Sequence, residues 1–297
     1  MNTIRLFSKH NITVILILMM SLTSCDLINP SEDAPGYVVV EKFDFNPTPS
    51  AAEFGSSSST KIKDVWVFID NEFLGSYELP ARFPSLKTGS HRVILSPGIM
   101  LNGISTTRSP YPFYEASIHE VVIPELGEVT ISPSTSYFES ADCAFCESFE
   151  GSGFSLSSTS NSDTTMSQLP VGDPNIFEGN SSGVVYLDTS NTQFEITSTS
   201  EYNLPNSNSA VFLELDYKIN QSMQVGLFVM KPNVASEQIP VITLNPTTTW
   251  NKIYIQLGYV VSSYNSSTTF KIYFGALKDP SVSNPAFYLD NIKVVHF

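Results

Sequence analysis

The sequence predicts an all-β protein made of two modules. Short β-type runs such as Val65–Ile69 and Trp250–Leu257 recur along the chain, whereas long stretches with helical periodicity are absent. Aromatic residues make up 12% of the chain and charged residues only 15%, while Ser, Thr and Asn are frequent. The chain is long enough for two domains of about 100–200 residues each. We therefore expect two successive modules of packed antiparallel sheets.

Residues 1–24 have the features of an export signal. They contain basic residues but no Asp or Glu, and their apolar run, Ile12–Leu22, is shorter than the roughly 20 residues that span a bilayer. The segment ends in Leu22-Thr23-Ser24-Cys25, which resembles the bacterial lipobox. The resemblance implies cleavage after Ser24 and lipidation of Cys25, so that a lipid anchor holds the protein on a membrane. The alternative is an ordinary signal peptide followed by a chance cysteine.

Residues 25–36 are polar and interrupted by proline, which predicts a flexible tether. Within the tether, Ser31-Glu32-Asp33 resembles the acidic export tags of surface lipoproteins of the Bacteroidetes. A solvated linker would explain the same residues. The resemblance implies that the protein lies in the cell envelope, lipid-anchored at the outer membrane or the cell surface.

The charge balance excludes nucleic acid as a partner. Removal of residues 1–24, which hold two basic residues and no acidic ones, leaves 13 Lys and Arg against 29 Asp and Glu, a net charge of −16. Such a surface repels phosphate backbones, because nucleic-acid-binding proteins need clustered Lys and Arg. The expected partners are the membrane, through the lipid anchor, and a glycan or an envelope protein.

After lipidation of Cys25, only Cys143 and Cys146 remain. In an oxidising compartment they can form a tight disulfide, or they can stay as two thiols. A redox role of the thioredoxin type needs a βαβ context, which the sequence lacks. A zinc site needs further ligands, and the mature chain offers few histidines.

The first module is expected over residues 37–140. Val65–Ile69 and Phe73–Leu79 are predicted strands joined by a turn at Asp70-Asn71, where Asn tolerates left-handed geometry, and Leu86–Leu95 adds a glycine turn and another strand. This stretch resembles PEGA-like and transthyretin-like envelope modules, which implies a small β-sandwich that spaces or docks other parts. A less regular segment follows, and its aromatic residues are expected to pack on the sandwich rather than form a binding patch: Tyr111, Phe113 and Tyr114.

The second module is expected over residues 143–297. It opens with Ser148–Phe154 and closes with Phe287–Val294, and this pairing resembles jelly-roll carbohydrate-binding modules. The resemblance implies a C-terminal jelly-roll β-sandwich whose first and last strands pair. It also implies that Glu150 and Asp290 can hold a structural Ca²⁺. Calcium takes several oxygen ligands, some from the backbone. The alternative is that both carboxylates only accept hydrogen bonds from backbone or hydroxyl groups.

Alternation along three strands separates an inner from an outer face. The inner faces are Leu213, Leu215 and Tyr217; Ile253, Ile255 and Leu257; and Phe270, Ile272 and Phe274. If two of these strands pair, the outer residues form one surface that suits a sugar, and they are the candidate ligand-binding residues: Lys252, Tyr254, Gln256, Lys271 and Tyr273. The alternative is an ordinary solvent-facing sheet.

No enzyme is expected. Glu214-Leu215-Asp216 resembles the start of the Glu-x-Asp-x-x-Glu signature of laminarinase-type glycosidases, but Ile219 stands where the second glutamate would be. Retaining hydrolysis needs two suitably spaced carboxyl groups. The leading function is therefore a non-catalytic envelope lipoprotein that binds a glycan or a partner protein through its jelly roll. The alternatives are a structural subunit of an envelope machine and a weak glycoside hydrolase.

Overall fold

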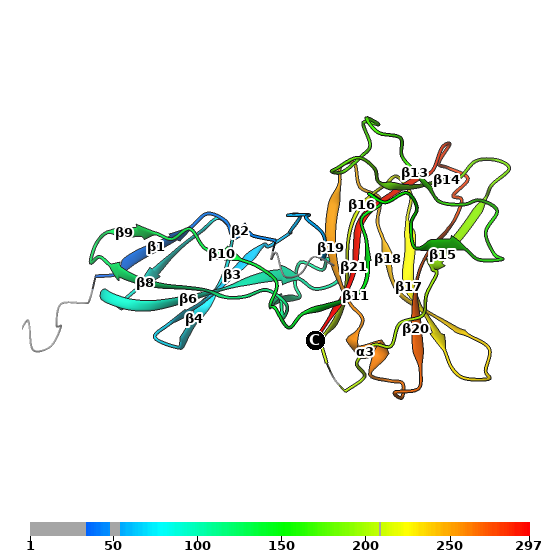
Figure 1. Ribbon diagram of the computed structural model, residues 1–297. Coiled ribbons are helices and arrows are strands. Elements are labelled where there is room, and N and C mark those ends of the chain that lie inside the picture. Colours follow the sequence, from blue (N-terminus) through cyan, green and yellow to red (C-terminus); the bar gives the residue numbers. More distant parts are fainter. Residues whose placement is uncertain (1–33, 48–53, 208) are drawn as a thin grey trace, which may run out of the picture.

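In the computed structural model, which describes residues 34–47, 54–207 and 209–297, nearly every regular element is a strand. The fold class predicted from the sequence is confirmed: a small β-sandwich is followed by a jelly-roll β-sandwich (Figure 1). One short helix, α3 (Gly258–Val261), follows strand β19 (Asn251–Gln256). No helix within the described ranges is both long and apolar enough to cross a membrane. Cys25 and the lipobox lie outside the described residues.

The first module has two main sheets. One has the order β5-β1-β9, the other runs β4-β3-β6, and β7 and β8 both pair with β6. A short ladder of β2 and β10 completes it. The strands are β1 (Gly36–Val40), β2 (Asp44–Phe45), β3 (Asp64–Ile69), β4 (Glu72–Glu78), β5 (Ala81–Ser85), β6 (Gly89–Met100), β7 (Arg108–Pro110), β8 (Ser117–Ile123), β9 (Glu128–Thr130) and β10 (Ser134–Thr135).

The β3–β4 hairpin forms where the sequence predicts it. Asp70 and Asn71 both have positive φ, 53° and 66°, as a tight hairpin turn of this hand requires. The inward side chains of the two main sheets meet in one apolar core, which includes Val38, Val65 and Phe83. The relation to PEGA-like and transthyretin-like modules stays a prediction from the sequence.

The second module is built from two facing sheets. The first has the order β13-β14-β21-β16-β19 with β11 also on β21, and the second has the order β12-β15-β20-β17-β18. As expected, the first strand of the module, β11, pairs with the last, β21. The strands are β11 (Asp142–Glu147), β12 (Leu156–Ser158), β13 (Ser167–Gln168), β14 (Gly183–Tyr186), β15 (Gln193–Ser198), β16 (Val211–Ile219), β17 (Met223–Met230), β18 (Glu237–Leu244), β20 (Thr269–Leu277) and β21 (Ala286–His296).

The predicted inner faces of β16, β19 and β20 are correct. Their alternate apolar residues, such as Leu215, Ile255 and Phe274, all belong to the core between the two sheets. Alternation predicts this correctly because successive side chains of a strand point to opposite sides. On β11, a disulfide joins Cys143 and Cys146.

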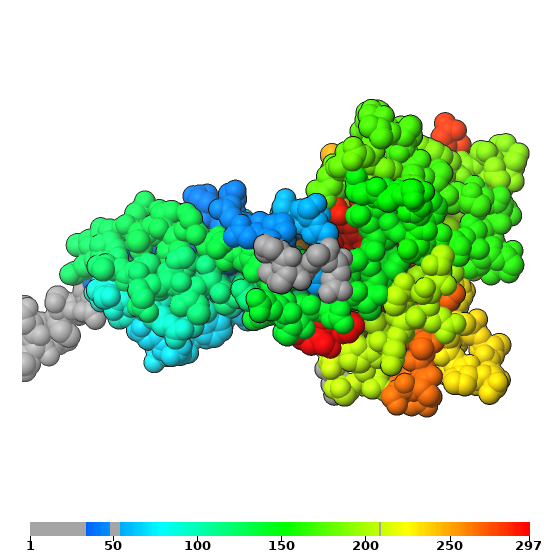
Figure 2. All heavy atoms as spheres, viewed as in Figure 1, coloured from blue at the N-terminus to red at the C-terminus, as the bar shows by residue number. Residues whose placement is uncertain are grey.

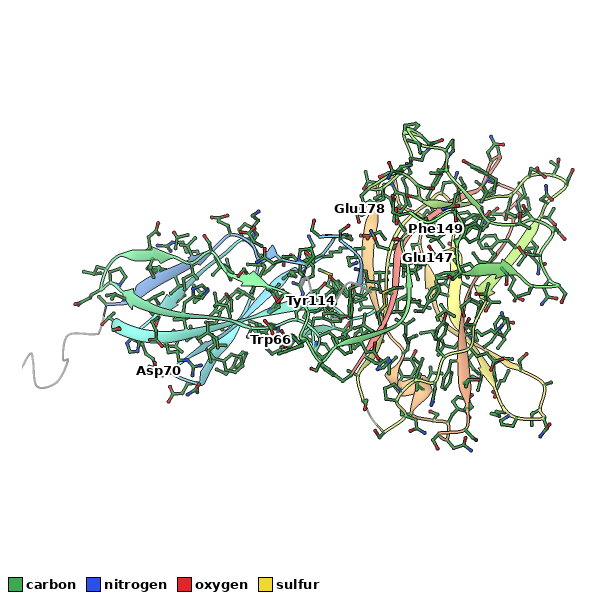
Figure 3. The ribbon with its side chains drawn as sticks, in the orientation of Figure 1. Trp66, Asp70, Tyr114, Glu147, Phe149 and Glu178 are labelled. Atoms are coloured by element: carbon green, nitrogen blue, oxygen red, sulfur yellow. A yellow bond between two sulfur atoms is a disulfide. The ribbon has the colours of Figure 1, made fainter. Side chains whose placement is uncertain are left out.

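The two modules meet along one face of the jelly roll (Figures 1 and 2). Leu101 forms a bridge with Tyr254 of β19, and the Tyr254 carbonyl accepts a hydrogen bond of 2.9 Å from the Asn102 N–H. A third core fills this junction, and Tyr114 lies within it (Figure 3). Tyr111, Phe113 and Tyr114 therefore pack against the second module, whereas the sequence predicted that they pack on their own sandwich.

Candidate functional site

The predicted sugar-binding face on β19 is covered by the first module. Tyr254 is 2% exposed and Lys252 is 5% exposed, and the Tyr254 ring lies 4.8 Å from that of Tyr111 between centroids. The prediction that Lys252, Tyr254 and Gln256 form an open binding face is therefore wrong. Alternation identifies the outer side of a strand correctly, but it carries no information about another module that covers that side.

Lys271 and Tyr273 do not join this face either, because β20 belongs to the other sheet. The two segments do not pair with each other, so the condition for a shared face is not met: β19 pairs with β16, and β20 pairs with β15 and β17. Tyr273 does point outward, but only 1% of it is exposed, because its ring lies across Gly226 and contacts Phe228. Its hydroxyl donates to Gln224 at 2.9 Å.

The junction contains a buried group of charged side chains. The Glu214 carboxylate accepts hydrogen bonds from the hydroxyls of Tyr111 (2.5 Å) and Tyr137 (2.9 Å) and lies 3.3 Å from the ammonium of Lys252. Burial by itself would lower the pKa of Lys252. The negative charges of Asp216 and Glu214 have the larger effect and raise the pKa of Lys252 above its usual value. Burial lowers the pKa of the neighbouring Lys293 to about 8.

The two acids of the glycosidase-like motif are therefore structural. Glu214 is fully buried, and Asp216 accepts hydrogen bonds from Ser59 at 2.8 Å and from Asn291 at 3.2 Å. Burial raises the pKa of Asp216 above its usual value. A polysaccharide cannot reach Glu214 and Asp216 while the modules are joined. These two side chains therefore do not supply the carboxyl groups of a hydrolase.

An open site lies elsewhere on the same sheet, where β14, β21 and β16 lie side by side. Tyr288 on β21 is paired with Val184 on β14 and with Lys218 on β16. Directly paired residues point to the same side of a sheet, and Phe287, next to Tyr288, faces the core. Tyr288 and Lys218 therefore face outward, as does Tyr186, two residues beyond Val184.

Aromatic rings form a row across this outer face. The Tyr288 ring centroid lies 6.2 Å from that of Tyr186 and 6.4 Å from that of Trp250, and Trp250 lies 5.1 Å from Phe177. Tyr186 is 50% exposed. We call Tyr186, Tyr288 and Trp250 the aromatic row. Burial and a hydrogen bond with Tyr186 raise the pKa of the Tyr288 hydroxyl above its usual value.

Tyr186 and Tyr288 of the aromatic row line a hollow of about 630 Å³. Its charged side chain is Lys218, whose ammonium donates to Asn175 at 2.8 Å and lies 5.1 Å from the Tyr288 ring centroid. The other polar lining residues are uncharged amides and hydroxyls: Asn220, Thr247, Thr248 and Asn284. This combination of rings, amides and hydroxyls in a concave site is typical of small-molecule and sugar recognition.

Sequence reasoning missed this site, although its signal was present. Tyr288 lies inside the closing strand that the sequence singled out, and alternation from Phe287 and Leu289 places it on the outer face. Tyr186 ends the run Gly183-Val-Val-Tyr186 and could be assigned in the same way. Their proximity could not be predicted, because 102 positions separate them along the chain.

The two candidate calcium ligands line one hollow at the edge of the junction, together with Glu178 and Asn291. Glu150 accepts hydrogen bonds from the Asn180 N–H and side-chain amide, at 2.9 and 3.0 Å, and Asp290 accepts them from Ser182 and the Asn291 N–H. Across the described part of the chain, no three His, Cys, Asp or Glu side chains converge as metal ligands. The present arrangement thus satisfies both carboxylates with hydrogen-bond donors, and calcium at this site stays a prediction from the sequence.

No protein-family model and no curated protein matches the chain. Solved structures with a similar fold include a variant of the family 29 carbohydrate-binding module CBM29-2 complexed with mannohexaose. It is 14% identical with a TM-score of 0.34, over 52% of this chain and 91% of that one. The family 11 carbohydrate-binding module from Clostridium thermocellum, in complex with a mixed-linked tetrasaccharide, is 12% identical with a TM-score of 0.36, over 52% and 94%.

A third match is the enzymatically active domain of tailspike protein 4 of bacteriophage CBA120. It is 14% identical with a TM-score of 0.36 and covers 50% of this chain but only 20% of that one. These likenesses are remote and carry no argument about ligands. The functional case therefore rests on the surface of this chain.

Proposed function

We propose that this protein is a non-catalytic, lipid-anchored protein of the bacterial cell envelope that binds a glycan at the aromatic row of its jelly roll. The observation that carries the proposal is the aromatic row on one outer face of the sheet, of which Tyr186 and Tyr288 also line a hollow of about 630 Å³. The candidate face on β19 identified from the sequence is buried, so the proposal transfers glycan binding to this other part of the same sheet.

The chemistry of the site suits a sugar. The C–H face of a sugar ring packs on an aromatic ring, while its hydroxyls exchange hydrogen bonds with amides and hydroxyls such as Asn220, Asn284 and Thr247. Successive rings in a row can contact successive sugar units.

A neutral glycan fits better than an acidic one. The whole chain carries a formal net charge of −14, and a surface of this sign repels polyanions. Lys218 adds only one positive charge to the lining of the hollow, which is small against this net charge. The expected ligand is an uncharged polysaccharide.

The test is affinity gel electrophoresis on a panel of soluble neutral polysaccharides. We expect Tyr186→Ala with Tyr288→Ala to weaken retention, since each lost ring contact contributes about 1 kcal/mol, or about fivefold in affinity. Tyr259→Ala is the matched control, because Tyr259 is 51% exposed on α3, much as Tyr186 is on β14. If the wild-type protein is retained by no polysaccharide, docking of a partner protein becomes the better account.

The lipid anchor is tested separately. The lipobox predicts that Cys25→Ala abolishes incorporation of labelled fatty acid and releases the protein from membranes. Fatty-acid labelling of this variant, together with its sedimentation with membranes, would show that the lipobox interpretation is wrong.

A further inference from the structure

The end of the first module that lies away from the jelly roll exposes large apolar side chains. Phe73 is 53% exposed, Leu86 is 66% exposed and Leu126 is 79% exposed. Leu74 and Val122 are exposed beside them. We call these five residues the distal tip. Soluble monomers rarely gather exposed apolar side chains in one place unless the patch contacts something.

The strand register brings Leu86 and Leu126 of the distal tip to the start of β1. Gly36 pairs with Ser85, so the β5–β6 turn with Leu86 lies beside it, and Tyr37 pairs with Glu128, so the β8–β9 turn with Leu126 lies on the other side. The opposite end of the module contacts β19 of the jelly roll. Figure 1 shows β1, β8 and β9 reaching the end away from the second module, and Figure 3 shows Asp70 of the β3–β4 turn at that end.

The apolar side chains of the distal tip are not merely scattered. Phe73, Leu74 and Leu86 line a hollow of about 430 Å³, and Pro35, at the start of the described chain, lines it too. Leu126 occupies the tip of its turn with φ of 56°, in the left-handed region that leucine rarely adopts. The turn therefore holds an apolar side chain in solvent at a position where Gly or Asn would be less strained.

The charges around the distal tip are largely paired with one another. Lys87 lies 2.6 Å from Glu72, Arg82 lies 3.2 Å from Glu128, and His91 lies 2.7 Å from Asp70. Paired charges reduce the net field that the tip presents. The patch is thus suited to an uncharged, apolar environment rather than to a highly charged partner.

We propose that the distal tip inserts into the interfacial region of the membrane that carries the lipid anchor, a step that rests on the anchoring in the proposed function. Pro35 is ten residues beyond Cys25, and ten extended residues reach at most about 35 Å. The tether therefore joins the described chain at the distal tip, and this end is held within reach of the bilayer. Insertion would hold the jelly roll at the end of the molecule that lies away from the membrane (Figure 1).

The experiment measures how deep single positions lie on zwitterionic phosphatidylcholine vesicles. A fluorescent dye is attached at Leu126→Cys in the full mature chain, and a lipid with a nitroxide on its acyl chain serves as quencher. The matched control is Val171→Cys, because Val171 is also 79% exposed but lies on the jelly roll. We expect several-fold stronger quenching at position 126 than at position 171, and its loss when Phe73→Ser and Leu86→Gln are added.

The protein is held on the vesicles without using its own lipidation. The chain carries Cys25→Ala and an N-terminal hexahistidine segment that binds a nickel-chelating lipid, so a failed lipobox does not affect this result. Equal quenching at positions 126 and 171 would overturn the proposal. Quenching at position 126 that survives Phe73→Ser with Leu86→Gln would overturn it as well, because those side chains would then not cause the insertion.

Discussion

At the scale of single residues, the central finding is a lysine and two carboxylates buried between the modules. Lys252 lies 3.3 Å from Glu214 and 3.8 Å from Asp216, and all three side chains are almost fully buried. Removing water from such charges costs several kcal/mol per ion, and only close pairing offsets that cost. The hydroxyls of Tyr111 and Tyr137 supply the further hydrogen bonds that Glu214 needs.

Truncation of Lys252 is expected to be severe. Lys252→Ala leaves Glu214 and Asp216 buried without their cation and should lower the free energy of unfolding by about 3–5 kcal/mol, measured by chemical denaturation of the full chain. The control is Lys231→Ala, which breaks an exposed pair with Glu237 at 3.1 Å and should cost less than about 1 kcal/mol. Similar effects of the two substitutions would contradict the role given to Lys252.

The raised pKa of Asp290 predicts that the stability of the protein depends on pH. Burial raises its pKa from 3.8 to about 7, and Glu178 and Asp216 add to the shift, while Ser182 and Asn291 oppose it. Between pH about 4 and 7 the native state therefore holds a proton that the unfolded chain has lost, so this group lowers stability as pH rises through that window. Above pH about 7 both states are ionised and the loss is complete.

The measurement is the stability of wild type relative to Asp290→Asn, which does not titrate. We expect the wild-type protein to lose up to about 4 kcal/mol relative to the variant between pH 4 and pH 7. The hydrogen bond with His91 lowers the pKa of Asp70. Acids such as Asp70 are present in both proteins, so their contribution cancels in the difference in stability between wild type and variant. A difference that does not change with pH would show that Asp290 titrates normally.

At the scale of elements, the pairing of β11 with β21 closes the jelly roll, and Glu150 and Asp290 lie beside that closure. The sequence predicts that calcium joins them, whereas the structure satisfies them with N–H and O–H donors. Calcium stays a prediction from the sequence. Its binding would also require ionised Asp290, so protons and calcium would compete.

Calcium binding is tested by thermal unfolding of the full chain. At a calcium concentration a hundredfold above Kd, binding to the native state alone would add about 2.7 kcal/mol of stability, which a chelator removes. The effect should vanish in the variant with Glu150→Gln and Asp290→Asn. If the melting temperature responds to neither calcium nor chelator, calcium does not bind at this site.

At the scale of the whole molecule, the junction joins two sandwiches into one unit. Tyr111, Phe113, Tyr137 and Phe212 are buried there with Tyr254, and Tyr254 accepts a hydrogen bond of 3.0 Å from the Lys61 N–H at its hydroxyl. An interface with a buried aromatic core and buried ion pairs resembles a domain core more than a transient contact. The modules are therefore expected to unfold together.

Calorimetry of the full chain should show a single cooperative transition. Tyr254→Ala should destabilise both modules by about 3 kcal/mol, because it removes a large ring from a packed core. Tyr254→Phe keeps the ring, loses the hydroxyl and should cost only about 1 kcal/mol. Two well-separated transitions in the wild-type protein would show that the junction does not couple the modules.

The fold class, the β3–β4 turn and the inner faces of β16, β19 and β20 could all be predicted from the amino-acid sequence. These features depend on neighbours along one strand or one turn, where alternation and left-handed residues act locally. Which outer faces stay open depends instead on how the two modules pack. In the folded protein, Tyr254 and Lys252 are buried beneath the first module, and Tyr186 lies next to Tyr288. The sequence could not predict this, because the exposure of a side chain depends on packing between segments far apart in the chain, which no local pattern encodes.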